Sequence, residues 1–144
     1  MAAVRRAEIT WKGSLIEGSG SIDAVGSGAF GPLDVTWAAR SEEASGGKTS
    51  PEELIAAAHA ACFSMALSNG LAQAGTPPDE LKTSAAVTFV PGSGITKIDL
   101  RVRGRVPGLD EGQFREAAQT AKENCPVSKA LAGVGEITLD ASLS

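Results

Sequence analysis

The sequence contains few of the side chains that build metal or cofactor sites. Its 144 residues include two cysteines, one histidine and no tyrosine. A structural zinc site takes four ligands, mostly cysteine and histidine, so these three side chains are too few for one. The glycine-rich stretches at residues 18–20 and 26–31 do not form a nucleotide-binding fingerprint before a helix. We therefore expect no metal and no bound cofactor.

A large excess of charge and a long hydrophobic run are also missing. The formal net charge is −4, which gives no general electrostatic reason to bind nucleic acid or an anionic membrane. The longest apolar run, Leu54 to Leu67, is shorter than the roughly 20 residues that span a bilayer. The N-terminal segment has two arginines with no apolar stretch behind them, unlike a signal peptide. These features predict a soluble cytoplasmic protein without nucleic-acid or membrane partners.

Alternating apolar residues predict strands near the N-terminus. Residues 7–12 and 33–39 alternate between apolar and polar side chains, and a weaker strand is expected between them, around residues 15–24. Together these segments predict an antiparallel N-terminal sheet. Arg40 is expected at the end of the third strand, on the face opposite Trp37 and just before a polar loop.

The next segment carries a strong helix start signal. Ser50 suits the N-cap, Pro51 the first helical position, and Glu53 completes a capping box. The pattern predicts a helix from Pro51 to about Ala72. Because residues 54–67 are apolar or small on almost every side, we expect a buried helix that packs against two layers, one of them in a second subunit.

More strands follow this helix. Apolar residues alternate over 85–89, 98–102 and 137–143. Basic residues on the second of these strands lack aromatic stacking partners, which favours a solvated sheet face over a nucleic-acid site. Strands separated by helices, without a regular strand–helix–strand repeat, predict an α+β fold in one domain over residues 1–144.

A second helix is expected to carry a cysteine toward the interior. Asp110 and Gln113 form a capping box. Cys125 lies three turns after Phe114, so both side chains project from the same apolar face. Pro126 then ends the helix.

The two cysteines are the main candidates for chemistry, although each can also be a buried small residue. In a reducing compartment, two cysteines are more often reactive or buried thiols than a permanent disulfide. Cys62 lies mid-helix, where the helix dipole gives a thiolate little support, so a reactive Cys62 needs a cation from elsewhere. Arg40 is the nearest upstream candidate; otherwise it is a solvated arginine. The long-range pair Cys62 and Cys125 fits a peroxidatic and resolving pair better than a metal site.

His59 lies three residues before Cys62 and raises an alternative, because a Cys–His pair can support acyl transfer. No Gly-x-Ser-x-Gly elbow is present, and residues three apart on one helix are usually packing neighbours, so a structural role is favoured. A redox-sensing or ligand-binding module without turnover, and a purely structural dimer, are further alternatives.

Two segments resemble the OsmC/Ohr family, in its OsmC branch. Residues 48–68, KTSPEELIAAAHAACFSMALS, resemble the family signature. Residues 121–131, AKENCPVSKAL, resemble the family's second-cysteine segment, and the EITLDA strand after it also fits. The order of elements matches over nearly the whole chain.

The resemblance implies a thiol peroxidase that forms an intertwined α+β homodimer and acts in the oxidative and osmotic stress response. It implies that Cys62 attacks an organic hydroperoxide, that Cys125 resolves the sulfenic acid as a disulfide, and that an external dithiol, such as a lipoylated protein, reduces the pair. The family's arginine and glutamate are carried onto Arg40 and Glu52, with Arg5 or Arg6 as alternatives to Arg40.

Glu52 and Cys62 are ten residues apart, which is roughly 15 Å along a helix at 1.5 Å per residue. A glutamate side chain cannot cover that distance on a straight helix. We therefore expect Glu52 to serve the active site of the partner subunit.

Overall fold

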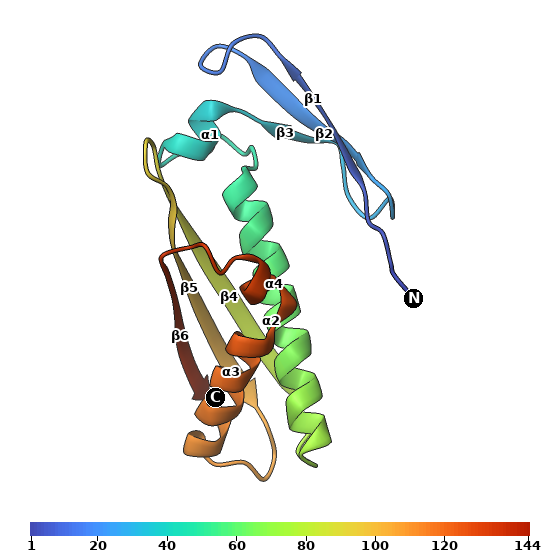
Figure 1. Ribbon diagram of the computed structural model, residues 1–144, viewed down its shortest axis with the longest axis vertical. Helices are drawn as coiled ribbons and strands as arrows, with labels where there is room; N and C mark the ends of the chain where they lie inside the picture. Colours follow the sequence, from blue (N-terminus) through green and yellow to red (C-terminus); the bar gives the residue numbers. More distant parts are fainter. The chain divides into compact units, whose positions relative to one another are not determined.

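The computed structural model describes all 144 residues (Figure 1). They form two compact units, Met1–Pro51 and Glu52–Ser144, each with its own three-stranded sheet. With two sheets and four helices, the α+β class is confirmed. The elements are β1 (Ala7–Lys12), β2 (Ser19–Val25), β3 (Leu33–Val35), α1 (Trp37–Ser41), α2 (Pro51–Gln73), β4 (Glu80–Val90), β5 (Gly94–Arg105), α3 (Glu111–Asn124), α4 (Pro126–Ala130) and β6 (Glu136–Leu143). That these units make one domain stays a prediction.

In the first unit, the strand order is β1-β2-β3 and both pairs are antiparallel, as expected. The third strand is shorter than the alternation predicts, because it ends at Val35. The side chain of Thr36 accepts a hydrogen bond from the Ala39 N–H at 3.1 Å and so caps the short helix α1. The expectation that Arg40 ends a strand is therefore wrong, since Arg40 lies in α1.

A glycine lets a tryptophan lie across this first sheet. Gly20 pairs with Trp11 on one side and Val35 on the other. A Cβ atom at Gly20 would lie 2.6 Å from the Trp11 ring and 2.9 Å from a Val35 methyl group. The sheet covers little of its apolar surface, because Ile9 is 63% exposed and Trp11 41%.

α2 begins at Pro51, the last residue of the first unit, as predicted, and runs through the second unit to Gln73. The roles of Ser50 and Glu53 in a capping box stay a prediction. One face of α2 is buried and includes Phe63, Leu67 and Leu71, whereas Met65 on another face is 72% exposed. The second layer expected over this helix also stays a prediction.

α2 is the one helix that is long and apolar enough to cross a membrane by length and composition, a property that the apolar run alone did not show. A single such helix is weak evidence for a membrane span, because core helices pass the same test. α2 contributes Phe63 and Leu67 to the core of the second unit.

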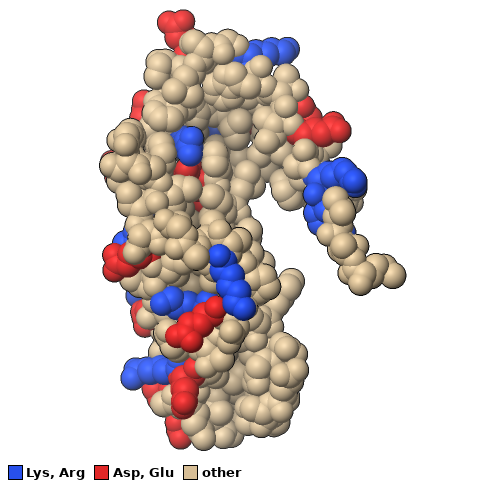
Figure 2. All heavy atoms as spheres, in the orientation of Figure 1, with Lys and Arg blue, Asp and Glu red and all other residues tan.

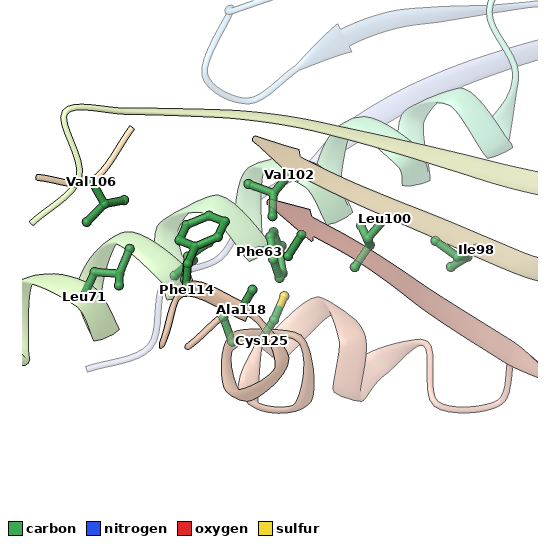
Figure 3. Packing of buried hydrophobic residues seen from close by; sticks show 12 residues of the cluster. Phe63, Leu71, Ile98, Leu100, Val102, Val106, Phe114, Ala118 and Cys125 are labelled. Atoms are coloured by element: carbon green, nitrogen blue, oxygen red, sulfur yellow. The ribbon is translucent and has the colours of Figure 1, made fainter. Parts of the chain in front are cut away.

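The second sheet has the order β4-β5-β6, with β4 antiparallel and β6 parallel to β5. These strands confirm the predicted ones with wider bounds. In Figure 1, α2 and α3 cover one face of this sheet. Their contact with it forms one core, which includes Phe63, Leu67, Ile98, Leu100, Val102, Phe114, Ala118 and Cys125 (Figure 3).

The basic residues of β5 are paired with carboxylates. Arg101 and Arg103 both bind Asp140 at 3.2 Å, and Lys97 binds Asp99 at 3.2 Å. Figure 2 shows lysine and arginine interspersed with acidic side chains over this unit. This pairing supports the interpretation of a solvated sheet face.

The predicted capping box at the start of α3 is confirmed. The Gln113 N–H donates to the Asp110 side chain at 2.8 Å, and the Asp110 N–H donates to the Gln113 side chain at 3.1 Å. The apolar face of α3 begins with Phe114, whose ring lies over Gly104 of β5. Three turns on, Cys125 is fully buried, as its spacing from Phe114 predicts.

Candidate active site

Two thiols from distant parts of the sequence meet inside the second unit. Cys62 lies midway along α2 and is half-buried, and Cys125 lies between α3 and α4 with no exposed surface. The two thiols are free, and each shifts the pKa of the other. The Cys125 side chain points into the core, toward Ala118 and Phe63 (Figure 3). The fold therefore brings together both predicted cysteines.

The sequence around Cys125 places its sulfur at the start of a helix. Cys125 is at once the C-cap of α3 and the N-cap of α4, and Pro126 occupies the first position of α4. Proline suits that position because the first turn leaves its N–H groups without intrahelical partners. The Val127 and Ser128 N–H groups act to lower the pKa of Cys125, although its side chain makes no cap hydrogen bond to them.

These surroundings move the pKa values of the two thiols in opposite directions. Burial raises the pKa of Cys62, and the hydrogen bond with Cys125 raises it further, against a smaller lowering by the Val127 N–H. Burial also acts to raise the pKa of Cys125, but the Ser128 N–H, the Cys62 thiol and the Ser128 hydroxyl together lower it below its ordinary value. Within this unit, hydrogen-bond donors thus stabilise the thiolate of Cys125 more than that of Cys62.

A buried His–Ser pair lies beside the thiols. His59 Nε2 and Ser128 Oγ are 2.7 Å apart, and both residues are buried. His59 Nδ1 has no hydrogen-bond partner, so neither ring nitrogen bonds Cys62. The Cys–His alternative is therefore disfavoured. Ser128 was not identified from the sequence, although its position three residues after an N-cap, where a side chain can reach back to the cap, is a usable signal.

The other two predicted site residues, Arg40 and Glu52, lie in different units, so whether they meet each other stays a prediction. Arg40 belongs to the unit Met1–Pro51 and Cys62 to the unit Glu52–Ser144, so their pairing stays a prediction. Glu52 is buried in the first turn of α2, and α2 continues without a break from there to Cys62. The alternative Arg5 and Arg6 precede β1 and are exposed.

A groove opens beside Cys62. It has a volume of about 970 Å³ and runs between α2 and α3. Most of its surface is apolar, contributed by side chains such as Met65, Leu71, Leu109 and Ala117. An alkyl chain could lie in this groove with its reactive end at the thiol. The structure contains no group of three or more histidine, cysteine or acidic side chains that could hold a metal ion.

Comparisons with known proteins point to one family. Residues 44–140 match the family model for OsmC-like proteins. The chain is 41% identical to peroxiredoxin OsmC of Escherichia coli over 99% of both chains. It is 34% identical to an organic hydroperoxide resistance protein of Xanthomonas axonopodis, over 67% of this chain and 68% of that protein.

Solved structures show the same fold. An organic hydroperoxide resistance protein from Elizabethkingia anophelis has a TM-score of 0.70 at 22% identity, with all of both chains covered. One from Legionella pneumophila has a TM-score of 0.66 at 23% identity, over 99% of both chains. The matched family model and the full-length similarity to a peroxiredoxin establish that this chain belongs to the OsmC/Ohr family of thiol-dependent peroxidases.

Proposed function

We propose that this protein reduces organic hydroperoxides to alcohols through a cycle of Cys62 and Cys125. The observation that carries the proposal is the pair of free thiols in one core, of which Cys62 also lines an apolar groove. The names of the two curated relatives, a peroxiredoxin and an organic hydroperoxide resistance protein, agree with this substrate class.

In the proposed cycle, the Cys62 thiolate attacks the terminal oxygen of the hydroperoxide. The oxygen–oxygen bond breaks, the alkoxide takes a proton and leaves as an alcohol, and Cys62 becomes a sulfenic acid. The Cys125 thiolate then attacks the Cys62 sulfur, so that a disulfide forms and hydroxide leaves to become water. An external dithiol, such as a lipoyl group on another protein, reduces the disulfide by exchange and is itself oxidised.

Arg40 is proposed to activate Cys62. Within the second unit, burial and the neighbouring thiol hold the pKa of Cys62 above its ordinary value, so a cation is needed to favour the thiolate. Arg40 supplies that charge and orients the peroxide, and the buried Glu52 holds the guanidinium through a charged hydrogen bond. Since Glu52 lies about 15 Å from Cys62 along α2, it serves the partner subunit in this proposal.

The proposed assembly is an intertwined homodimer. Apolar side chains are exposed on both units, including Met65 of α2 and Ile9 and Trp11 of β1. A three-stranded sheet with an uncovered apolar face needs a further layer for stability. A second copy of the chain would cover these residues. We also propose a cytoplasmic location, where reducing conditions keep both thiols available.

The test is a free-thiol titration with peptide mapping, before and after a slight excess of tert-butyl hydroperoxide. We expect the parent to lose both thiols and to yield a peptide linked through Cys62 and Cys125. The linked peptide should be absent from the Cys62→Ser variant. If both thiols stay free after minutes of exposure, the peroxidase cycle is wrong for this chain and a thiol-bearing binding module takes its place.

A second readout separates turnover from redox sensing. With a dithiol in excess, a peroxidase consumes many equivalents of peroxide per chain, whereas a sensor stops after one. Competition between an alkyl hydroperoxide and hydrogen peroxide tests the role of the groove. A larger rate constant for hydrogen peroxide would contradict the proposed preference for organic substrates.

A further inference from the structure

One polar contact inside the second unit has no part in the proposed cycle. His59 Nε2 and Ser128 Oγ lie 2.7 Å apart, and both residues are buried. His59 Nδ1 has no partner, so this contact is the one hydrogen bond of the imidazole ring. A buried neutral hydrogen bond adds little net stability, but it fixes the distance and direction between the two groups that it joins.

The two partners lie one helical turn away from the two cysteines. His59 precedes Cys62 by three residues on α2, and Ser128 follows Cys125 by three residues. Residues three apart on a helix are neighbours on one face. The Lys129 N–H donates to the Cys125 carbonyl at 3.1 Å, which closes the first turn of α4 around Ser128. A displacement of Ser128 relative to α2 therefore moves Cys125 as well.

α4 has no other directional side-chain contact with the rest of the unit. Its five residues make one side-chain hydrogen bond to another element, the bond to His59. Val127 packs against the core through apolar contacts, which favour burial but are not directional. The hydrogen bond between His59 and Ser128 is thus the contact that sets the position of α4 on α2.

The two cysteines lie beside this contact. Cys125 belongs to the core of the second unit, and Cys62 packs against the same core. Cys62 and Pro126, the residue after Cys125, line one groove. Each thiol also shifts the pKa of the other, as neighbouring groups do. A small displacement of α4 along α2 would therefore change how the two sulfur atoms meet.

We propose that His59 and Ser128 form a clamp between α2 and α4, which positions Cys125 for bond formation with Cys62. Both are positioning residues, because neither touches the peroxide in the proposed cycle. For its role in catalysis the inference rests on that cycle. The clamp itself belongs to the reduced protein, and it favours the disulfide whichever oxidant forms it.

In the proposed cycle the clamp acts on the second step. The Cys125 sulfur attacks the Cys62 sulfenic sulfur, the sulfur–sulfur bond forms, and the sulfur–oxygen bond breaks to release hydroxide, which becomes water. A second hydroperoxide competes, because it converts the sulfenic acid to a sulfinic acid and leaves as an alcohol. The first of these two reactions depends on the effective concentration of Cys125 at Cys62, and the second does not. Loss of the clamp should therefore favour the sulfinic acid.

A matched pair of variants isolates the Ser128 hydroxyl. Threonine and valine have nearly the same shape, and both are branched at Cβ, so the effect of an added methyl group on packing and on the helix is shared. Ser128→Thr keeps a hydroxyl for His59, whereas Ser128→Val does not. His59→Leu breaks the same bond from the side of α2, and it provides a second test if valine prevents folding.

The first experiment uses no peroxide. Each variant is equilibrated with mixtures of oxidised and reduced dithiothreitol, which takes up the two electrons when the protein disulfide forms. Alkylation and mass spectrometry then give the fraction of linked Cys62 and Cys125. We expect Ser128→Thr to stay near the parent and the equilibrium constant of Ser128→Val to fall about fivefold. That factor corresponds to about 1 kcal/mol, the usual net contribution of one hydrogen bond.

This equilibrium separates a clamp from a contact that only stabilises the fold. Such a contact contributes equally to the reduced and the oxidised protein, so its loss leaves the equilibrium unchanged. As a control, Ser64→Ala removes another hydroxyl of α2, which bonds the Ala60 carbonyl and Thr83 of β4, and should keep the parental value. Cooperative thermal unfolding establishes that each variant is folded. Equal constants for folded Ser128→Thr and Ser128→Val would overturn the clamp.

The second experiment measures the competition at Cys62 with increasing tert-butyl hydroperoxide. Intact mass gives the ratio of sulfinic acid to disulfide. In Ser128→Val, half of the protein should be overoxidised at about a fivefold lower peroxide concentration than in Ser128→Thr. The rate at which the Cys62 thiol is first lost should be the same in both. If only that first rate falls in Ser128→Val, the hydroxyl acts on Cys62 itself and the clamp is overturned.

The two experiments distinguish the inference from the proposed function. If the parent forms the disulfide with oxidised dithiothreitol but not with peroxide, the peroxidase cycle fails, and the first experiment alone decides on the clamp. If peroxide forms the disulfide equally well in Ser128→Thr and Ser128→Val, the cycle stands and the clamp is wrong. If neither oxidant links the two cysteines, both are wrong.

Discussion

At the scale of single residues, the two thiols differ in what surrounds them. Cys125 is fully buried at the start of α4, whereas Cys62 is half-buried and lines the apolar groove. A thiol inside the core is less accessible to a substrate than the half-buried Cys62 beside the groove. The assignment of Cys62 as the attacking residue and Cys125 as the resolving residue therefore agrees with their access to solvent.

This difference in access predicts what happens when the resolving thiol is removed. In Cys125→Ser, Cys62 should still consume peroxide, but the sulfenic acid has no internal partner and is oxidised further to sulfinic and sulfonic acids. Intact mass should show successive additions of oxygen to Cys62 and turnover that stops within a few cycles. Sustained turnover in Cys125→Ser, at the parental rate and without overoxidation, would contradict the role of Cys125.

The buried His59 predicts how stability depends on pH. Burial lowers its pKa in the folded state, whereas the unfolded chain takes up a proton near pH 6.5. The unfolded state therefore binds more protons as pH falls through about 6.5, and the free energy of unfolding decreases until the lower folded pKa is reached. Above about pH 6.5 this contribution is absent.

Urea unfolding of the parent and of His59→Gln between about pH 7.5 and 5.5 checks this. The midpoint of the parent should fall more steeply with decreasing pH than that of the variant, because glutamine does not titrate. Acidic side chains elsewhere affect both proteins equally. Parallel curves would show that His59 is accessible to protons in the folded state.

At the scale of elements, the close approach of α3 to β5 depends on a glycine. A Cβ atom at Gly104 would lie 2.5 Å from the Phe114 ring, in a core with no exposed surface at Phe114. We expect Gly104→Ala to lower the free energy of unfolding by about 1–3 kcal/mol, as overpacking typically does. Chemical denaturation measures the change.

The matched control is Gly70→Ala on α2. No atom lies within 4 Å of a Cβ atom there, and the residue is inside a helix. Alanine is favoured over glycine in a helix interior, so this variant should gain about 0.5–1 kcal/mol. If Gly104→Ala is as stable as the parent, α3 can move away from β5 without a loss of folding stability.

The elements that were predicted best from the sequence have both a regular spacing of apolar residues and a signal that marks where the element begins. α3 has its capping box and an apolar stripe that leads to Cys125, and both appear in the structure. The segment 33–39 misled, because its alternation continues past Thr36, and a local side-chain cap there starts a helix instead. The alternation of apolar and polar residues over seven positions does not show that a helix cap at Thr36 competes with continuation of the strand.

The candidate site was predictable only in part, for a similar reason. Each cysteine stands in a recognisable segment, so both were found. Ser128 was missed because its partner, His59, is far away in sequence, and only the packing of α4 on α2 brings them to 2.7 Å. Arg40 belongs to a segment with weak patterns, and its place relative to Cys62 depends on the arrangement of the two units and on the proposed dimer.

At the scale of the whole molecule, the central prediction is that active sites are shared between subunits. If Glu52 serves the partner's thiol, Glu52→Gln and Cys62→Ser should each be inactive as homodimers. Refolded together, they form heterodimers that contain one site with both residues intact. With equal amounts and random pairing, a two-fold symmetric dimer should recover about a quarter of the parental activity.

Peroxide consumption by the refolded mixture is the measurement, and each variant refolded alone is its control. The recovery should appear only after chains have exchanged. A mixture that stays inactive although mass spectrometry detects heterodimers would place Glu52 and Cys62 of one chain in the same site, and α2 would have to bend in the assembled protein.

The distance in sequence between the two cysteines has a consequence for the reductant. Sixty-three positions separate them, and β4, β5 and α3 lie between. Closing a loop of that length restricts the unfolded chain enough to favour the fold by about 4 kcal/mol in the chain-entropy model. Folding and disulfide formation are thermodynamically linked, so the fold stabilises the disulfide against reduction by the same free energy. For two electrons this lowers the reduction potential of the disulfide by about 90 mV. In the proposed cycle, oxidation by peroxide therefore stabilises the fold, and we expect that a strongly reducing dithiol is needed to reduce the disulfide again.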